Sequence, residues 1–106
     1  MVNIEKDSHI SKIKTNIRRI SLNDIVKKHR IKDGALKMDA EGAEYKIIAN
    51  ASINTLKKFK QVQIDFHRHG SDKITNKLSK AGFKSQVTMT ILAGKIKSGY
   101  ISAQRN

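Results

Sequence analysis

Three carboxylates lie within six residues of one another, at a spacing that could support acid–base chemistry. Asp39, Glu41 and Glu44 follow an apolar stretch at residues 35–38. The pattern predicts a buried strand that ends at Asp39 and turns at once into a helix, with Gly42 permitting a tight turn. Ligands of open α/β sheets bind at the carboxyl ends of parallel strands. Asp39 is therefore placed for chemistry and is the central candidate residue of the site.

The same acids also have a purely structural explanation. Acidic side chains are stabilised in the first turn of a helix, because they offset the positive end of the helix macrodipole. The spacing of the three carboxylates does not separate this explanation from the catalytic one.

A second group of candidates follows the next apolar segment. Apolar and polar residues alternate over residues 62–66, which predicts a strand that ends near Asp65 and His67. Roughly twenty residues separate it from the first strand, enough for a right-handed crossover between parallel neighbours. The two strands would then end at one edge of the sheet, which would bring Asp39 close to both residues. His67 is the candidate base, because imidazole titrates near neutral pH. A partly exposed histidine at a strand end, with no catalytic role, fits the sequence equally well.

The same three side chains offer an alternative chemistry. Asp39, Asp65 and His67 together provide the oxygen and nitrogen ligands that divalent cations accept. Their spacing matches no metal-binding signature, so we assign no metal ligand.

Several flanking elements would position these residues. Ser21 with Asp24 forms a capping pattern that opens a helix running to about His29. Residues 12–19 fit both a strand and a helical stripe, and we assign a strand. The polar residues 1–11 are expected to be disordered.

Beyond the acidic stretch we expect alternating helices and strands within a single domain of residues 1–106. A helix over residues 42–50 is followed by a further turn near residues 53–59. A second helix opens at Ser71 and ends at Gly82 in a Schellman motif. Residues 83–89 and 95–102 then form an antiparallel hairpin.

Composition restricts the functional classes. The 22 basic residues exceed the 9 acidic ones, giving a charge of +13, which favours anionic partners. The basic residues form no run, and aromatic residues do not interleave with them as stacking platforms would, so nucleic acid is not favoured. There is no cysteine, no signal-peptide core and no apolar run of membrane-spanning length. We expect a cytoplasmic protein without a membrane span.

Three blocks of the sequence, in their order and spacing, resemble the FkbM-type methyltransferases. The blocks are ISLNDIV (20–26), LKMDAEGAEY (36–45) and QIDFH (63–67). Gly82-Phe83 and Gly99-Tyr100-Ile101 also fit, so the resemblance covers residues 17–103. Members of this family use S-adenosylmethionine and often methylate hydroxyl oxygens. The resemblance implies an α/β fold: the C-terminal half of a Rossmann-like sheet, with two parallel strands, a terminal antiparallel hairpin and helices on the faces.

The resemblance also implies roles for the site residues. Asp39 and His67 would be catalytic, while Glu41, Glu44 and Asp65 would bind the acceptor, a small-molecule or glycan hydroxyl. The family more often carries Glu where this chain has Asp65. The cofactor would be S-adenosylmethionine, but no Gly-rich strand-to-helix turn occurs. We therefore assign no cofactor-binding residue and leave open whether the chain is an enzyme by itself.

The missing half of the domain would pair with one edge of the strand at residues 35–38. An unpaired strand edge invites another chain. Either the segment around Ile13 covers this edge, or two copies pair there, or a second polypeptide completes the sheet. We expect self-association or a partner chain. The alternative function is a basic module that binds nucleic acid or another anion without catalysis.

Overall fold

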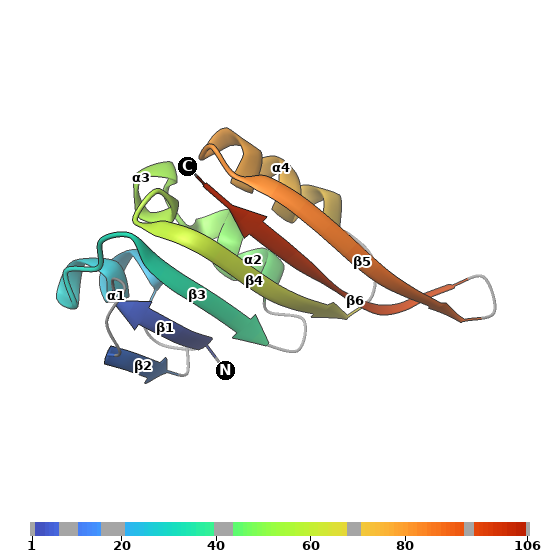
Figure 1. The fold of residues 1–106 in the computed structure, drawn as a ribbon, viewed down its shortest axis with the longest axis horizontal. Helices are drawn as coiled ribbons and strands as arrows, with labels where there is room; N and C mark the ends of the chain where they lie inside the picture. Colours follow the sequence, from blue (N-terminus) through green and yellow to red (C-terminus); the bar gives the residue numbers. More distant parts are fainter. Residues whose placement is uncertain are drawn as a thin grey trace.

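A computed structural model of the chain describes residues 2–6, 11–15, 21–39, 44–67, 71–92 and 95–105. Its side chains are described at residues 21–39, 44–66, 71–89 and 98–105. The described residues form a six-stranded sheet and four helices (Figure 1).

The strands have the spatial order β2-β1-β3-β4-β6-β5, in which only β3 and β4 are parallel. Their bounds are β1 Val2–Lys6, β2 Ser11–Thr15, β3 Gly34–Asp39, β4 Phe59–His67, β5 Lys84–Leu92 and β6 Lys95–Gln104. The helices are α1 Leu22–Lys28, α2 Glu44–Asn50, α3 Ile53–Leu56 and α4 Ser71–Lys80.

The central part of the sheet confirms the expected fold class. The parallel pair β3–β4 is joined by a crossover that contains α2 and α3, as parallel strands require. The terminal hairpin β5–β6 follows α4, and β6 lies antiparallel to β4. The chain therefore has the predicted partial Rossmann-like sheet.

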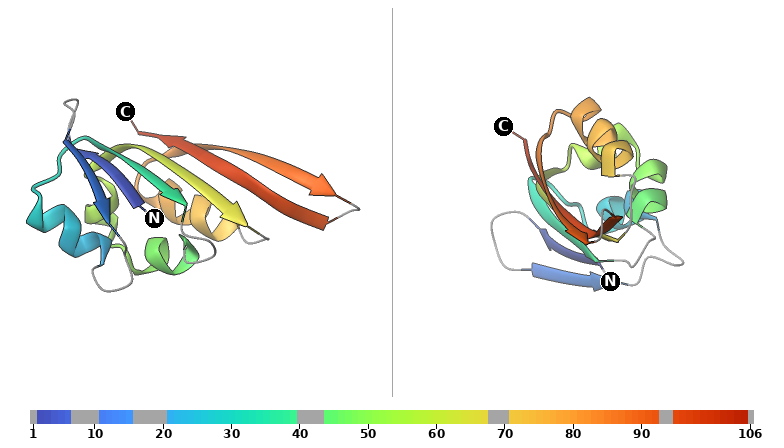
Figure 2. Two further views of the ribbon diagram at one scale, coloured as in Figure 1. Left: turned by 90° about the horizontal axis from the view of Figure 1, so that it is seen from below. Right: turned by 90° about the vertical axis from the view of Figure 1, so that its right-hand side faces the viewer.

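All four described helices lie on one face of the sheet (Figure 2). The strands match this arrangement by alternation: Leu36 and Met38 are buried, whereas Lys37 and Asp39 are exposed. Such alternation is typical of a sheet with one face packed on the core and the other in water.

The core lies between the sheet and the helix layer. Phe66 is fully buried there, and it packs directly over Gly99 on the neighbouring strand β6. A Cβ atom at Gly99 would lie 2.6 Å from the Cζ atom of Phe66 and would also meet the backbone oxygen of Thr88. The close approach of ring and backbone explains why glycine occupies this position.

Helix α1 begins as the sequence predicts. The Ser21 hydroxyl accepts a hydrogen bond of 3.1 Å from the backbone N–H of Asp24. This bond satisfies one of the free donors at the helix N-terminus.

Helix α4 ends in the predicted Schellman motif. The N–H of Phe83 donates to the carbonyl oxygen of Leu78, and the N–H of Gly82 donates to that of Ser79, both at 3.0 Å. Gly82 has a φ of +92°, a value that glycine adopts without steric cost.

Helix α1 ends in the same motif without a glycine. The N–H of Ile31 donates to the carbonyl oxygen of Val26 at 3.1 Å, and that of Arg30 donates to Lys27 at 3.4 Å. Arg30 therefore occupies the position that Gly82 occupies in α4, with a φ of +51°. The left-handed region costs a residue with a Cβ atom about 1–2 kcal/mol.

The N-terminal segment differs from the prediction of disorder at residues 1–11. Val2–Lys6 forms β1, which lies antiparallel to both β2 and β3. The strand expected over residues 12–19 is β2, Ser11–Thr15, and the rest of that range lies outside the described residues. Because β1 pairs with the free edge of β3, the segment around Ile13 lies one strand further out than expected.

Candidate active site

The parallel pair brings two of the predicted carboxylates side by side. Asp39, the last residue of β3, is the register partner of Asp65 on β4. The preceding partners, Met38 and Ile64, are fully buried under the helix layer. Asp39 is exposed and Asp65 is half-buried. By alternation, both carboxylates belong to the uncovered face of the sheet, at the edge where the strands end.

The strand β4 continues two residues past Asp65 to His67, whose register partner is Ser98 of β6. The backbone of His67 therefore lies at the expected edge. Its side chain lies outside the described side chains, so its role as a base stays a prediction. Tyr100, the partner of Asp65 on β6, is 39% exposed and adds a phenol beside Asp65.

Glu44 lies apart from this pair. It belongs to the first turn of α2 and is fully buried, with an exposed fraction of 0%. A ligand on the open face of the sheet has no access to it in this conformation. Its role in acceptor binding stays a prediction, as does the helix-dipole explanation. Glu41 lies outside the described residues, so its role stays a prediction.

Tyr45, next to Glu44, was given no role from sequence. Burial raises the pKa of its hydroxyl, and the negative charges of Glu44 and Asp72 raise it further. The hydroxyl oxygen is buried and has no hydrogen-bond partner among the described residues. Tyr45 therefore remains protonated to a higher pH than an exposed tyrosine. No signal in the sequence marks this, because it depends on the packing of α2 against α4.

No three His, Asp or Glu residues lie close enough to hold a metal ion within the described part of the chain. Glu41 and the side chain of His67 lie outside the described part of the chain. The cation-binding alternative therefore stays a prediction. The described helices include none with the length and apolar character needed to cross a bilayer.

The observed arrangement defines a class of protein. It is an α/β domain with a parallel strand pair, an antiparallel C-terminal hairpin and polar residues at the carboxyl edge, where such sheets bind ligands.

Comparison with known families agrees with this class. A family model described as the methyltransferase FkbM domain matches residues 3–85, and the chain belongs to this family. The match begins within β1 and ends within β5. No curated protein and no solved structure gives a significant match.

Proposed function

We propose that this chain forms the acceptor side of an S-adenosylmethionine-dependent methyltransferase that acts on a hydroxyl group. The observation that carries the proposal is the pairing of Asp39 with Asp65 at the carboxyl edge of β3 and β4. Membership of the FkbM methyltransferase family supports the reaction type.

The paired carboxylates suit the needs of an alcohol acceptor. Neighbouring strands are about 4.8 Å apart, so one hydroxyl compound can contact both side chains. One carboxylate would orient the hydroxyl through a hydrogen bond while the other accepts its proton. We assign the base to Asp39, the more exposed of the two, and we retain His67 as the alternative base.

The cofactor would supply the methyl group as an electrophile. The described residues include no Gly-rich cradle for it. The sequence has no Gly-rich strand-to-helix turn, and the free edge of β3 is taken by the antiparallel strand β1. We therefore propose that cofactor binding requires further polypeptide, supplied either by the same protein or by a partner chain.

Two-dimensional NMR tests the acceptor side without the cofactor. The isotope-labelled chain is titrated with a panel of monosaccharides and inositol. We expect shifts at the ends of β3 and β4, which Asp39→Asn and Asp65→Asn abolish and Asp24→Asn, on α1, leaves intact. Shifts confined to other elements, or no shift with any compound at 50-fold excess over the chain, would contradict the proposal.

Transfer of a labelled methyl group tests the reaction itself. In an assay that contains the completing partner, we expect Asp39→Asn to lower the rate by about 10²–10⁴-fold, the usual contribution of a general base. An unchanged rate would exclude Asp39 as the base.

The alternative of a basic anion-binding module is favoured by a different observation. A groove with four basic residues and no acidic one lies at the other end of the parallel strands.

A further inference from the structure

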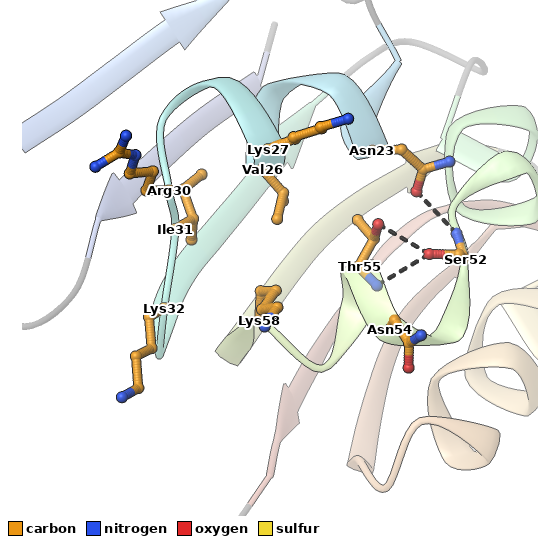
Figure 3. A pocket seen from close by; sticks show the side chains of 10 residues that line it. All are labelled: Asn23, Val26, Lys27, Arg30, Ile31, Lys32, Ser52, Asn54, Thr55 and Lys58. Carbon is orange, nitrogen blue, oxygen red and sulfur yellow. Dashed lines mark hydrogen bonds between the residues drawn. The ribbon is translucent and has the colours of Figure 1, made fainter.

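A groove lies between α1 and α3, near the points where β3 and β4 begin (Figure 3). Its volume is about 600 Å³, which falls within the range of small-molecule sites in proteins. β3 has six residues, so its start and Asp39 are about 16 Å apart at the usual rise of a strand. The groove is therefore separate from the candidate active site.

The lining of the groove is strongly cationic. Four exposed basic side chains contribute to it: Lys27, Arg30, Lys32 and Lys58. None of the ten residues that line it is acidic. Lys58 lies between the wall that carries Ile31 and the wall that carries Thr55 (Figure 3). Figure 3 shows the charged ends of Arg30 and Lys32 directed away from the other lining side chains. Both side chains are exposed, so an anion in the groove could draw them inward, and it would meet no carboxylate of the lining.

The inner part of the groove is apolar, and its walls are fixed. Val26 and Ile31 are buried and contribute the apolar surface. The side-chain oxygen of Asn23, on α1, accepts a hydrogen bond of 3.0 Å from the N–H of Ser52, the N-cap of α3. The Ser52 hydroxyl in turn accepts from the N–H of Thr55 at 3.0 Å (Figure 3). The first bond joins the two walls and the second fixes the start of α3, so the groove is formed before any ligand binds.

We propose that this groove binds a small organic phosphate with an apolar part, such as a nucleoside phosphate. The lysines and Arg30 would bind the phosphate oxygens, with Arg30 able to donate two parallel hydrogen bonds. The apolar part would lie on Val26 and Ile31. A small ligand is favoured over a nucleic acid strand because the four basic residues line a single concave site. This inference does not depend on methyl transfer.

Isothermal titration calorimetry with ADP tests the proposal. We expect Lys58→Gln and Arg30→Gly each to weaken ADP binding by about tenfold, as for a lost charge-assisted hydrogen bond. Lys80→Gln removes a charge from α4, away from the groove, and should leave the affinity unchanged. Arg30→Gly should also keep or raise the thermal midpoint of unfolding, which separates its binding defect from a folding defect. Inorganic pyrophosphate should bind more weakly than ADP, since it has no apolar part.

Three results would overturn the proposal. The first is no heat with ADP at millimolar concentration. The second is an equal loss in Lys80→Gln and Lys58→Gln, which would indicate diffuse attraction by the net charge. The third is tighter binding of a single-stranded ten-nucleotide RNA than of ADP. In that case RNA binding would depend steeply on salt concentration, and Lys80→Gln would also reduce this dependence. The third result would assign the basic surface to nucleic acid. Asp39→Asn should leave ADP binding unchanged whether or not the chain supports methyl transfer.

Discussion

The two ends of the parallel pair β3–β4 differ in charge and in chemistry. The strands begin beside the cationic groove, where the N–H of Gly34 donates to the carbonyl oxygen of Lys58. They end at Asp39 and Asp65 on the open face. Parallel strands begin at one edge and end at the other, so each edge gathers residues that are distant in sequence. One small sheet therefore carries two separate candidate sites of opposite charge.

Arg105, near the C-terminus of the chain, stabilises the amino end of the parallel pair. The guanidinium of Arg105 donates to the carbonyl oxygens of Phe59 and Lys57, and it lies 3.9 Å from the carboxylate of Asp33.

The largest expected loss of stability comes from the buried interior of β4, which connects the amino and carboxyl ends of the parallel pair. Ile64→Ala removes a fully buried side chain from the centre of the sheet, so we expect a loss of about 2–5 kcal/mol in the free energy of unfolding. Urea denaturation measures it. Gln63→Ala, on the open face, should stay within about 0.5 kcal/mol of the parent. A loss below 1 kcal/mol for Ile64→Ala would show that the strand pair is not the shared support of the two ends.

A smaller loss of stability should be confined to the amino end of the parallel pair. Arg105→Gln removes two hydrogen bonds from a charged donor, which should cost about 1.5–3 kcal/mol of unfolding free energy. Asp33→Asn removes only the half-exposed ion pair and should cost less than about 1 kcal/mol. Amide exchange should speed up near Phe59 and Gly34 in Arg105→Gln and remain unchanged at Asp65. Faster exchange at both ends would show that they are coupled.

Substitutions at the C-terminal turns of α1 and α4 should change the stability of the chain in opposite directions. Gly82→Ala places a Cβ atom at a φ of +92° and should destabilise the chain by about 1–2 kcal/mol. Space is not the cause, because that Cβ atom would meet its nearest neighbour, in Arg105, at an ordinary 3.6 Å. Arg30→Gly should stabilise the chain by about 0.5–1 kcal/mol. Thermal unfolding measures both, and a destabilised Arg30→Gly would contradict the strain that we assign to Arg30.

The smallest effect concerns Tyr45 on α2, the helix that follows the carboxyl end of β3. Because the folded state raises the pKa of Tyr45 above its ordinary 10.0, this residue's contribution to stability is complete below pH 10 and is lost as the pH rises further. Tyr45→Phe should remove that alkaline loss and change stability at pH 7 by at most about 1 kcal/mol, towards greater stability. Denaturation midpoints at pH 7 to 11 measure it. Tyr100→Phe is the control and should retain the alkaline loss.

Local signals in the sequence were sufficient for much of the fold. The cap at Ser21 and the stop at Gly82 depend on a few adjacent residues, and both are confirmed. The parallel pair was predictable because alternation and crossover length are readable along the chain. This pairing also placed Asp39 beside Asp65.

Features that depend on distant contacts were not predictable. The five residues of β1 alternate too briefly to indicate a strand, and they are ordered by pairing with β3. The complete burial of Glu44 depends on packing that its neighbours in the sequence do not indicate. The groove combines Lys27 with Lys58, which only the contact between α1 and α3 brings together. The turn at Arg30 was missed because no glycine marks it.

The position of β1 has a consequence for assembly. Both hydrogen-bonding edges of β3 are occupied, by β1 on one side and β4 on the other. A partner that adds a strand next to β3 must first replace the four register pairs between β1 and β3. Joining of the two halves would then be an exchange reaction, whose rate levels off with partner concentration at the rate at which the N-terminal hairpin detaches.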